Sequence, residues 1–257
     1  WKIALSHYQP QEAAAQTQAP APEPPDPQLY EELVEQVNFV YPHEVAVAIP
    51  AKVAASKLAA QQDGSGEITL SRPAWLGEQG MTPAERGTAL HAFMQFADFS
   101  AALADPQGER ERLVEMALLT PEQGAAVDLS RVGKFLESPL GKRVLRSSQV
   151  EKERRFTAVI PASLAEPEAS AGEEEVILQG AVDCTFVEDG CLHIIDFKTD
   201  RVSDMEELWQ RYQAQLQLYG YAMEEVSGLP VGELILYSTW LNRASSRPFG
   251  KTPSKAH

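Results

Sequence analysis

Two apolar runs on either side of a Glu-Asp-Gly turn are the clearest pattern in this chain. The runs cover residues 180–187 and 191–197. Asp189 and Gly190 lie between them, and this dipeptide suits a type I′ turn because both central positions of that turn have positive φ. The pattern therefore predicts a tight antiparallel hairpin towards the C-terminal end of the chain.

The register of this hairpin brings two acidic residues together. If the turn has two residues, Glu188 faces Cys191, and Asp183 then lies directly across from Asp196. Opposed side chains in such a ladder have Cβ atoms roughly 4.5–5.5 Å apart, and like charges at that distance are destabilising. Lys198 is two residues beyond Asp196 and points to the same face. Because a divalent cation would relieve the repulsion, the pattern predicts a metal-dependent active site.

Capping residues mark two longer helices around the hairpin. The segment 82–85 (Thr-Pro-Ala-Glu) places Thr at the cap, Pro at the first helical position and Glu at the third, so we expect a helix from there to about Phe99. The segment 203–206 (Ser-Asp-Met-Glu) is a second capping box. It predicts a helix that continues to about Val226 and stops at Gly228.

Weaker signals predict the rest of the fold. Further helices are expected over 29–42 and 51–62 and, in short pieces that restart at Thr120-Pro121 and Ser138-Pro139, over 107–147; strands are expected over 155–160 and 231–240; loops are expected over 63–80 and 161–174, with a polar tail from Arg243. This order of elements predicts an α/β or α+β fold with a mixed central sheet flanked by helices.

The 257 residues suit one large domain, or one domain with an extension. Residues 9–28 are rich in Pro, Ala and Gln, which is typical of a flexible linker. Because the chain does not begin with Met, we expect residues 1–8 to end a preceding region of a longer polypeptide and residues 29–257 to form the main domain. With no signal peptide and no apolar run near the ~18 residues that span a membrane, we expect a cytoplasmic protein.

The net charge of −15 argues against nucleic-acid binding by this chain alone, because phosphate contacts supply most non-specific affinity. A DNA substrate remains compatible with this charge if another part of the polypeptide holds the strand. One stretch is basic, and it contains Lys142, Arg143, Arg146, Lys152, Arg154 and Arg155. Two interpretations of this basic stretch stay open: it contacts a phosphate backbone, or it is an ordinary solvated helix face.

Three more segments carry polar residues that could join a hydrolytic site. Gly87-Thr88-x-x-His91 lies on the first capped helix, and Glu153 enters the strand before the hairpin. On the later helix, Gln215 and Tyr219 are four residues apart and share a face with Tyr212.

Together these motifs resemble the nuclease domain of the bacterial AddA/RecB helicase–nuclease family, within the wider PD-(D/E)xK nuclease group. The matching pieces are Gly87-Thr88-x-x-His91, Gly180-x-x-Asp183, Asp196-Phe197-Lys198-Thr199-Asp200 and Tyr212…Gln215-Leu216…Tyr219. The resemblance covers roughly residues 40 to 240, and the segments 41–43 and 49–52 favour AddA over RecB. It implies a restriction-endonuclease-like core with extra N-terminal helices and a motif core at 82–240.

The residue types suit phosphodiester hydrolysis, which requires positive charge near the phosphoryl oxygens and an activated water. Asp183 and Asp196 are hard oxygen ligands for Mg²⁺ or Mn²⁺. The resemblance adds His91 and the carbonyl oxygen of Phe197 as ligands, and an imidazole ligand makes Mn²⁺ a plausible substitute for Mg²⁺. Lys198 would stabilise the transition state.

The resemblance assigns supporting roles to other residues. Gln215 and Tyr219 would orient the scissile strand or the lysine, or they simply line a packing face of the helix. Glu153 would hold the site residues in position, or it would have a structural role only. No iron–sulfur cluster is expected, because a cluster needs about four cysteines and the chain has Cys184 and Cys191 only.

The resemblance implies an exodeoxyribonuclease that degrades single-stranded DNA unwound by helicase domains of the same polypeptide. Such a complex processes double-strand ends for recombinational repair, contains an AddB-type partner, and uses ATP only in the helicase part. Two alternatives stay open: a catalytically silent scaffold that guides DNA or docks a partner chain, and a stand-alone nuclease of the same superfamily.

Overall fold

The computed structural model describes residues 26–39, 50–55, 57, 81–165 and 174–250. The chain divides into two compact units, Trp1–Glu44 and Val45–His257. In the first unit the described residues form helix α1 (Pro27–Val37), which begins behind an Asp26 cap and has no buried residue. Helix α1 therefore begins and ends earlier in the chain than the helix predicted over 29–42. Most of the predicted linker and residues 1–8 lie outside the described residues.

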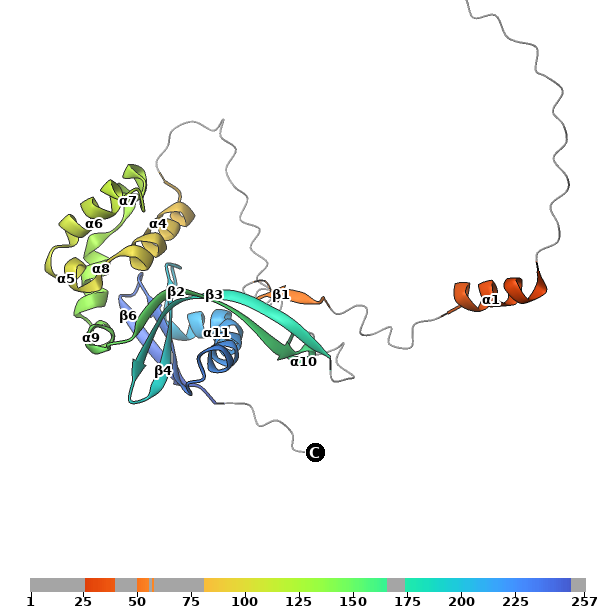
Figure 1. The fold of residues 1–257 in the computed structure, drawn as a ribbon. Coiled ribbons are helices and arrows are strands. Elements are labelled where there is room, and N and C mark those ends of the chain that lie inside the picture. Colours follow the sequence, from red (N-terminus) through yellow and green to blue (C-terminus); the bar gives the residue numbers. More distant parts are fainter. Residues whose placement is uncertain (1–25, 40–49, 56, 58–80, 166–173, 251–257) are drawn as a thin grey trace, which may run out of the picture. The chain divides into compact units, whose positions relative to one another are not determined.

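The second unit is built on a mixed sheet (Figure 1). In the part of the chain that the structure describes, the sheet has six strands. They are β1 (Lys52–Ala54), β2 (Val150–Pro161), β3 (Glu175–Glu188), β4 (Cys191–Lys198), β5 (Val231–Ser238) and β6 (Arg243–Pro248). Neighbours follow the order β1-β3-β4-β5-β6, and β2 pairs with β3. Two pairs, β1 with β3 and β4 with β5, are parallel, so the predicted mixed sheet is confirmed.

Caps and prolines begin most of the helices where the sequence places them. The helices among the described residues of this unit are α4 (Pro83–Phe96), α5 (Phe99–Ala104), α6 (Pro106–Glu115), α7 (Pro121–Ala126), α8 (Leu129–Glu137), α9 (Pro139–Arg146), α10 (Ala162–Ala165) and α11 (Met205–Ser227). The predicted capping box at Thr82 forms, and Thr120 begins another. The box predicted at 203–206 is wrong in detail, because the side chain of Asp204 caps the helix by accepting from the N–H of Glu207. Helix α11 begins behind Asp204 and ends at Gly228, whose φ of 69° is the left-handed conformation that glycine adopts without strain. No helix in the described ranges combines the length and apolar character needed to cross a membrane.

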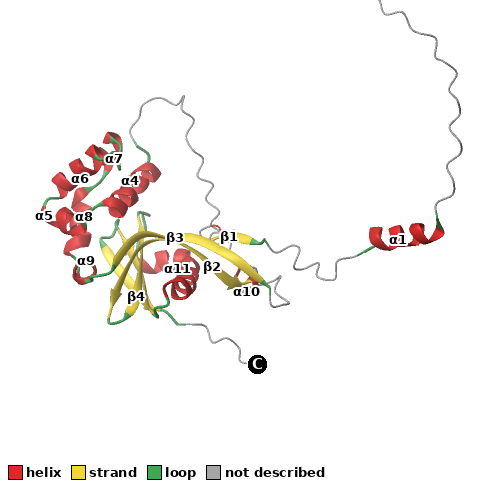
Figure 2. Ribbon diagram, viewed as in Figure 1, coloured by secondary structure: helices red, strands yellow, loops and turns green. Residues whose placement is uncertain are grey.

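Apolar side chains fill the space on both faces of the sheet. Figure 2 shows α11 on one side of the strands and the group α4–α9 on the other. Ile194 and Leu234 pack with Leu216 in the core under α11. Their neighbours along the strands, such as Ile195, face the opposite way and pack with Phe135 and other residues of the helical group. We call these the α11 core and the helical core.

Strands β2 and β3 change faces near their middle. Leu178 and Val182 of β3 lie in the α11 core, whereas Phe186 lies in the helical core. Residues two apart in a regular strand stay on one face, so β3 must twist sharply between Val182 and Phe186. At this point the pairing of β2 with β3 omits Glu153 and Asp183, and Glu153 has a φ of 48°. Asp183 therefore lies where the two cores meet.

Several segments differ from their predicted structure, and the loop predicted over 161–174 contains helix α10. The predicted helix over 51–62 is wrong at its start, because Lys52–Ala54 form β1 and pair with β3. The helix propensity of alanine contributes little free energy per residue. The free energy gained by extending a sheet over an apolar face outweighs it. The polar tail contains strand β6, which pairs with β5, and the strand predicted over 155–160 extends over β2. Residues 58–80 and 166–173 lie outside the described residues.

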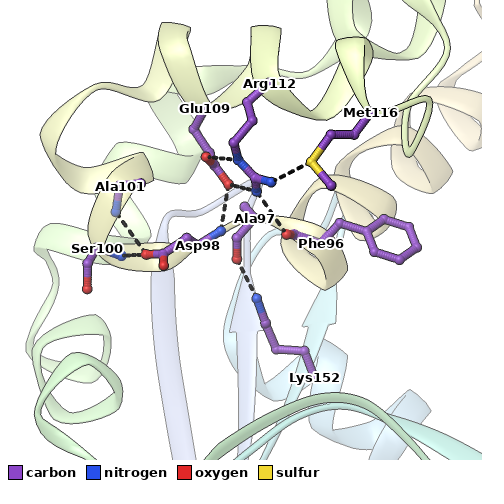
Figure 3. Close-up of polar contacts among 9 residues, drawn as sticks. All are labelled: Phe96, Ala97, Asp98, Ser100, Ala101, Glu109, Arg112, Met116 and Lys152. Carbon is purple, nitrogen blue, oxygen red and sulfur yellow. Dashed lines mark hydrogen bonds and ion pairs between the residues drawn. The ribbon is translucent and has the colours of Figure 1, made fainter.

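Hydrogen bonds to the buried carboxylate of Glu109 on α6 join this helix to the junction of α4 and α5 (Figure 3). The carboxylate of Glu109 accepts hydrogen bonds from Nε of Arg112 at 2.7 Å, Nη2 of Arg112 at 2.5 Å and the backbone N–H of Asp98 at 2.6 Å. Asp98 caps α5, and Nζ of Lys152 donates to the carbonyl of Ala97 beside it. The polar groups at the junction of α4, α5, α6 and β2 are thus satisfied by one network.

Candidate active site

The hairpin turn forms as predicted, but the ladder stops one position before the two aspartates. Asp189 and Gly190 have φ values of 52° and 77°, and Glu188 pairs with Cys191. Pairing of β3 with β4 continues to Cys184 and Ile195 and does not include Asp183 and Asp196. The predicted cross-strand pair is therefore wrong in detail, because β3 turns away at its change of face. Oδ2 of Asp183 instead accepts a hydrogen bond from the backbone N–H of Phe197 at 2.8 Å.

Asp196 is buried at the end of β4 and is paired with Lys198. Its side chain is 3% exposed, and its Oδ2 lies 2.7 Å from Nζ of Lys198. This oxygen has no aligned hydrogen-bond donor, so the contact is mainly one of charge. Burial raises the pKa of Asp196, and the charge of Asp183 adds to this, while the charge of Lys198 opposes it. The site thus holds a carboxylate oxygen that the protein leaves partly unsatisfied.

Helix α11 positions the ammonium group of Lys198 from the other side. Oε1 of Gln215 lies 3.4 Å from Nζ of Lys198, and Nε2 of Gln215 donates to the hydroxyl of Tyr219 at 2.6 Å. The ammonium also lies 3.8 Å from the ring centroid of Tyr212, whose hydroxyl donates to Asp200 at 3.0 Å. These residues are one turn or two apart, so a single face of α11 presents them all to the end of β4.

His91 approaches the site from α4. Its Nδ1 lies 3.5 Å from Oδ2 of Asp183, and 38% of its side chain is exposed. Burial lowers the pKa of His91, but the hydrogen bond and charge of Asp183 outweigh it and raise the pKa above the ordinary value of 6.5. The same pairing lowers the pKa of Asp183 against the effect of its own burial. His91 and Asp183 therefore stabilise each other in their charged forms.

Gly87 allows α4 to approach the site closely. A Cβ atom at Gly87 would lie 2.9 Å from Oγ1 of Thr199, the residue that follows Lys198. His91 is one helical turn further along α4. The glycine of the Gly-Thr-x-x-His motif therefore lets α4 bring His91 close to the end of β4.

The types of donor atom at this site suit a divalent cation, but the arrangement of the side chains suits one less well. Carboxylate oxygens of Asp183 and Asp196 with an imidazole nitrogen of His91 are a set that Mg²⁺ or Mn²⁺ accepts. Yet within the described ranges no three His, Cys, Asp or Glu side chains are gathered as a metal-binding group. The charges are paired within the protein, His91 with Asp183 and Lys198 with Asp196. The partly unsatisfied Oδ2 of Asp196 is the observation that fits a cation ligand.

Glu153 lies beside the site with a strained backbone. A φ of 48° is unfavourable for a residue with a Cβ atom, and such strain is often found at functional positions. The charge of Glu153 contributes to raising the pKa of Tyr219, after burial and the charges of Asp196 and Asp183. The sequence offers no signal for this conformation, because it depends on the twist of β2 against β3.

Half of the basic residues of the stretch are engaged in ion pairs or ring contacts within the protein. Arg143 binds Glu188 at 2.6 Å and Glu233 at 2.6 Å, and Arg154 binds Glu151 at 3.0 Å. Burial lowers the pKa of Lys152, which also lies 4.8 Å from the ring centroid of Phe99. The exposed members are Lys142, Arg146 and Arg155. Within this stretch, which the structure describes throughout, only this smaller group has the exposure that a phosphate backbone requires.

The two cysteines occupy the hairpin as structural residues. Cys184 is fully buried in the helical core, and burial raises the pKa of its thiol to about 12. Cys191 is half-buried at the turn, and neither forms a disulfide. A thiol with such a pKa is neutral at physiological pH and is a poor metal ligand.

Sequence reasoning missed a group of residues on the far side of Lys198. Thr239 donates to the carbonyl of Lys198 through its N–H at 2.9 Å and through its hydroxyl at 3.2 Å. Trp240 follows in the turn after β5 and lies against Arg131 and Arg201. These residues come from three separate segments, and no spacing in the sequence could have brought them together.

Comparisons with known proteins agree with this geometry. Residues 67–246 match a family model described as the PD-(D/E)XK nuclease superfamily. The A subunit of an ATP-dependent helicase/nuclease from Acetivibrio thermocellus is 35% identical over 231 residues, which are 83% of this chain and 18% of that protein. A protein of the same name from Clostridium botulinum is 32% identical over 222 residues, which are 80% of this chain and 17% of that protein. The chain therefore spans less than a fifth of these curated relatives.

Among solved structures, the crystal structure of SSO0001 matches with a TM-score of 0.34 and 13% identity, covering 87% of this chain and 75% of that chain. So loose a match carries no argument about function.

Proposed function

Because the chain belongs to the PD-(D/E)XK nuclease superfamily, we propose that it hydrolyses phosphodiester bonds of single-stranded DNA with a bound divalent cation. Nucleases of this superfamily generally use divalent metal ions. The observation that carries the proposal is the buried Asp196, held 2.7 Å from Lys198 beside the pair of Asp183 and His91. Buried charges are costly, and a protein retains them where chemistry needs them.

Four residues would hold the cation. Asp183 and Asp196 would supply carboxylate oxygens, His91 a ring nitrogen and Phe197 its carbonyl oxygen. When bound, the cation supplies positive charge against the phosphoryl oxygens and activates water. Mg²⁺ is the cation we propose, and Mn²⁺ would substitute because of the imidazole ligand.

The other residues would act on the phosphate and the water. Water adds to phosphorus, one P–O ester bond breaks, and a proton passes to the departing oxygen. Lys198 would stabilise the negative charge that develops on the phosphoryl oxygens. Gln215 and Tyr219 would keep the ammonium in place, because Gln215 lies 3.4 Å from Nζ of Lys198 and donates to the hydroxyl of Tyr219 at 2.6 Å.

The names of the relatives suggest the wider process. We propose that residues 1–8 end a helicase region, that residues 9–28 link it to the nuclease domain at 29–257, and that the helicase uses ATP to feed single-stranded DNA to this site. An AddB-type partner would complete the complex. Its work would be exonucleolytic processing of double-strand ends for recombinational repair, in the bacterial cytoplasm.

Degradation of a labelled single-stranded oligonucleotide tests the proposal. We expect cleavage with Mg²⁺ or Mn²⁺ and none with EDTA, and Asp196→Ala and Lys198→Ala should each lower the rate at least ~100-fold. Asp189→Asn removes one negative charge from the exposed turn of the same hairpin and should leave the rate unchanged. Circular dichroism checks that each variant is folded.

One observation favours a second candidate, a catalytically silent scaffold that guides DNA or docks a partner chain. The carboxylates are already paired with His91 and Lys198 within the protein. Calorimetry with Mn²⁺ separates the two candidates. Binding that Asp196→Ala abolishes supports the nuclease, whereas a folded chain that neither binds Mn²⁺ nor cleaves DNA supports the silent scaffold.

A further inference from the structure

A pocket of about 170 Å³ lies beside the C-terminal end of β4. The proposed chemistry of hydrolysis does not use it. Helices α4 and α8 form one wall, and the segments after β4 and β5 form the other. Its polar and aromatic lining includes Arg86, Arg131, Thr199, Arg201, Thr239 and Trp240, and we call it the Trp240 pocket. Pockets for whole small molecules are usually ~300–1,000 Å³. The Trp240 pocket therefore suits one unit of a polymer better than a complete cofactor.

Direct contacts connect the Trp240 pocket to the catalytic residues. Thr199 follows Lys198 in the chain, and Thr239 donates two hydrogen bonds to the carbonyl of Lys198, at 2.9 and 3.2 Å. Gly87 lines the pocket one turn before His91 on α4. The Trp240 pocket therefore adjoins the backbone of the segment that carries Lys198.

The charge of the lining is opposite to that of the whole chain. Three arginines line the Trp240 pocket against one acidic residue, Asp128, which lies 3.0 Å from Nε of Arg131. The complete chain has a net charge of −15. A local excess of guanidinium groups in an acidic protein is a site where a polyanion can bind in spite of the overall repulsion.

Trp240 provides an exposed aromatic surface in the same place. Its side chain is 38% exposed, whereas Trp209 is 1% exposed. The guanidinium groups of Arg201 and Arg131 lie 4.9 and 5.2 Å from its ring centroid. Aromatic rings next to arginines are the combination on which unpaired bases stack while their phosphates are held.

We propose that the Trp240 pocket binds the nucleotide next to the scissile phosphate, with its base on Trp240 and its phosphate on Arg201. Arg86 and Arg131 contribute positive charge at the rim. This subsite rests on the proposed nuclease function for its role, but it binds single-stranded DNA without any catalytic step. A duplex cannot use it, since its bases are already stacked on one another.

Binding in EDTA tests the subsite separately from cleavage. Fluorescence anisotropy of a labelled oligothymidylate would measure affinity for the wild type, Trp240→Ala, Trp240→Phe and Arg201→Gln. We expect Trp240→Ala to weaken binding about 5- to 100-fold, the range for loss of one base stack, and Trp240→Phe to weaken it much less. Lys134→Gln is the charge control, because Lys134 is exposed one turn beyond Arg131 on α8 and does not line the pocket.

An oligonucleotide without bases separates stacking from charge. Trp240→Ala should not weaken binding of an abasic strand, whereas Arg201→Gln should weaken binding of both strands. Equal affinities of the wild type, Trp240→Ala and Arg201→Gln for oligothymidylate would overturn the subsite, even if the enzyme cleaves DNA. Loss of affinity in these variants, with neither Mn²⁺ binding nor metal-dependent cleavage by the wild type, would support the subsite and overturn the nuclease.

Discussion

Lys198 is held at the end of β4 by three kinds of contact. Asp196 provides an opposite charge, Gln215 an amide oxygen and Tyr212 an aromatic ring. The aspartate contact carries most of the energy because both groups are nearly buried. Gln215 adds direction, since it also bonds to Tyr219 and cannot rotate freely. A flexible lysine is thereby restricted to one position.

Gln215→Ala should slow cleavage without unfolding the protein. Without Gln215 the ammonium of Lys198 keeps its charge but loses one of its constraints, so we expect a fall in kcat of about 10- to 100-fold, the usual range for residues that orient a catalytic group. Lys198→Ala should lose more. Single-turnover cleavage with saturating enzyme would measure the effect. Gln217→Ala is the matched control, because Gln217 lies on a different face of α11.

At this scale the hairpin register predicts that Asp183, Asp196 and Lys198 lie close together, because a two-residue turn leaves one pairing. The structure does gather the three, but Asp183 and Asp196 are not a cross-strand pair, and their roles stay predictions. The roles of His91 and Gln215 needed the resemblance to a known family. The Trp240 pocket could not be predicted at all, since its lining comes from segments that only the tertiary fold brings together.

Helices α8 and α9 meet so closely that only glycine fits between them. A Cβ atom at Gly141 would lie 2.2 Å from the carbonyl oxygen of Phe135 and 2.7 Å from Cα of Leu136. Backbone atoms cannot move aside as a side chain can. The two short helices therefore depend on this glycine for their packing over the helical core.

Gly141→Ala should lower the free energy of unfolding by about 2 kcal/mol or more, since overpacking typically costs about 1–3 kcal/mol and here the backbone must shift. Urea unfolding followed by circular dichroism would measure it. Gly133→Ala is the opposite case, because nothing lies within 4 Å of the new Cβ in α8. It should raise stability by about 0.5–1 kcal/mol through helix propensity. A stable Gly141→Ala variant would contradict the tight contact.

The Glu109 network makes the junction of α5 and α6 sensitive to acid. Hydrogen bonds from Arg112 lower the pKa of Glu109 below its ordinary value of 4.5, against the opposing effect of burial. A lowered pKa in the folded state means that the carboxylate stabilises the fold above pH 4.5 and that this contribution is lost as the pH falls below it. The wild type should therefore weaken in acid at this junction.

Glu109→Gln should cost about 1.5–3 kcal/mol at neutral pH, the usual range for a hydrogen bond to a charged group. The difference from the wild type should narrow as the pH falls through the lowered pKa of Glu109, below 4.5, because the wild-type carboxyl then becomes neutral as well. Urea unfolding at neutral pH and in acid would measure this difference in the free energy of unfolding. Glu111→Gln, at an exposed site on the same helix, should show no such dependence. A difference that stays constant with pH would contradict the role of the charge.

Elements with strong local signals could be predicted, and those that depend on partners could not. The turn at Asp189, the cap at Thr82 and the stop at Gly228 are local chemistry, and all three form. Strands β1 and β6 have short polar or alanine-rich sequences, and only pairing with β3 and β5 makes them strands. Tertiary context overrides propensity in such segments.

The charge of the whole molecule limits how it can hold DNA. The chain has a net charge of −15, and half of the basic residues of its central basic stretch are engaged in internal contacts. Positive charge at the proposed subsite comes mainly from Arg86, Arg131 and Arg201. Within the described residues, the three arginines of the Trp240 pocket are a local excess of positive charge in an acidic chain, which suits a domain that receives a strand from elsewhere.

The salt dependence of binding should reveal this small contact. Each phosphate contact on single-stranded DNA contributes about −0.7 to the slope of log K against log salt, so three arginines predict a slope near −2 and weak affinity at physiological salt. If the strand also ran over Lys142, Arg146 and Arg155, the slope would be about twice as steep. Anisotropy titrations of an oligothymidylate over a range of salt concentrations would distinguish these paths. Arg201→Gln should lower the slope by about one contact, whereas Arg155→Gln should lower it only if the longer path is used. Tight binding at physiological salt by this chain alone would contradict the idea that another part of the polypeptide must deliver the strand.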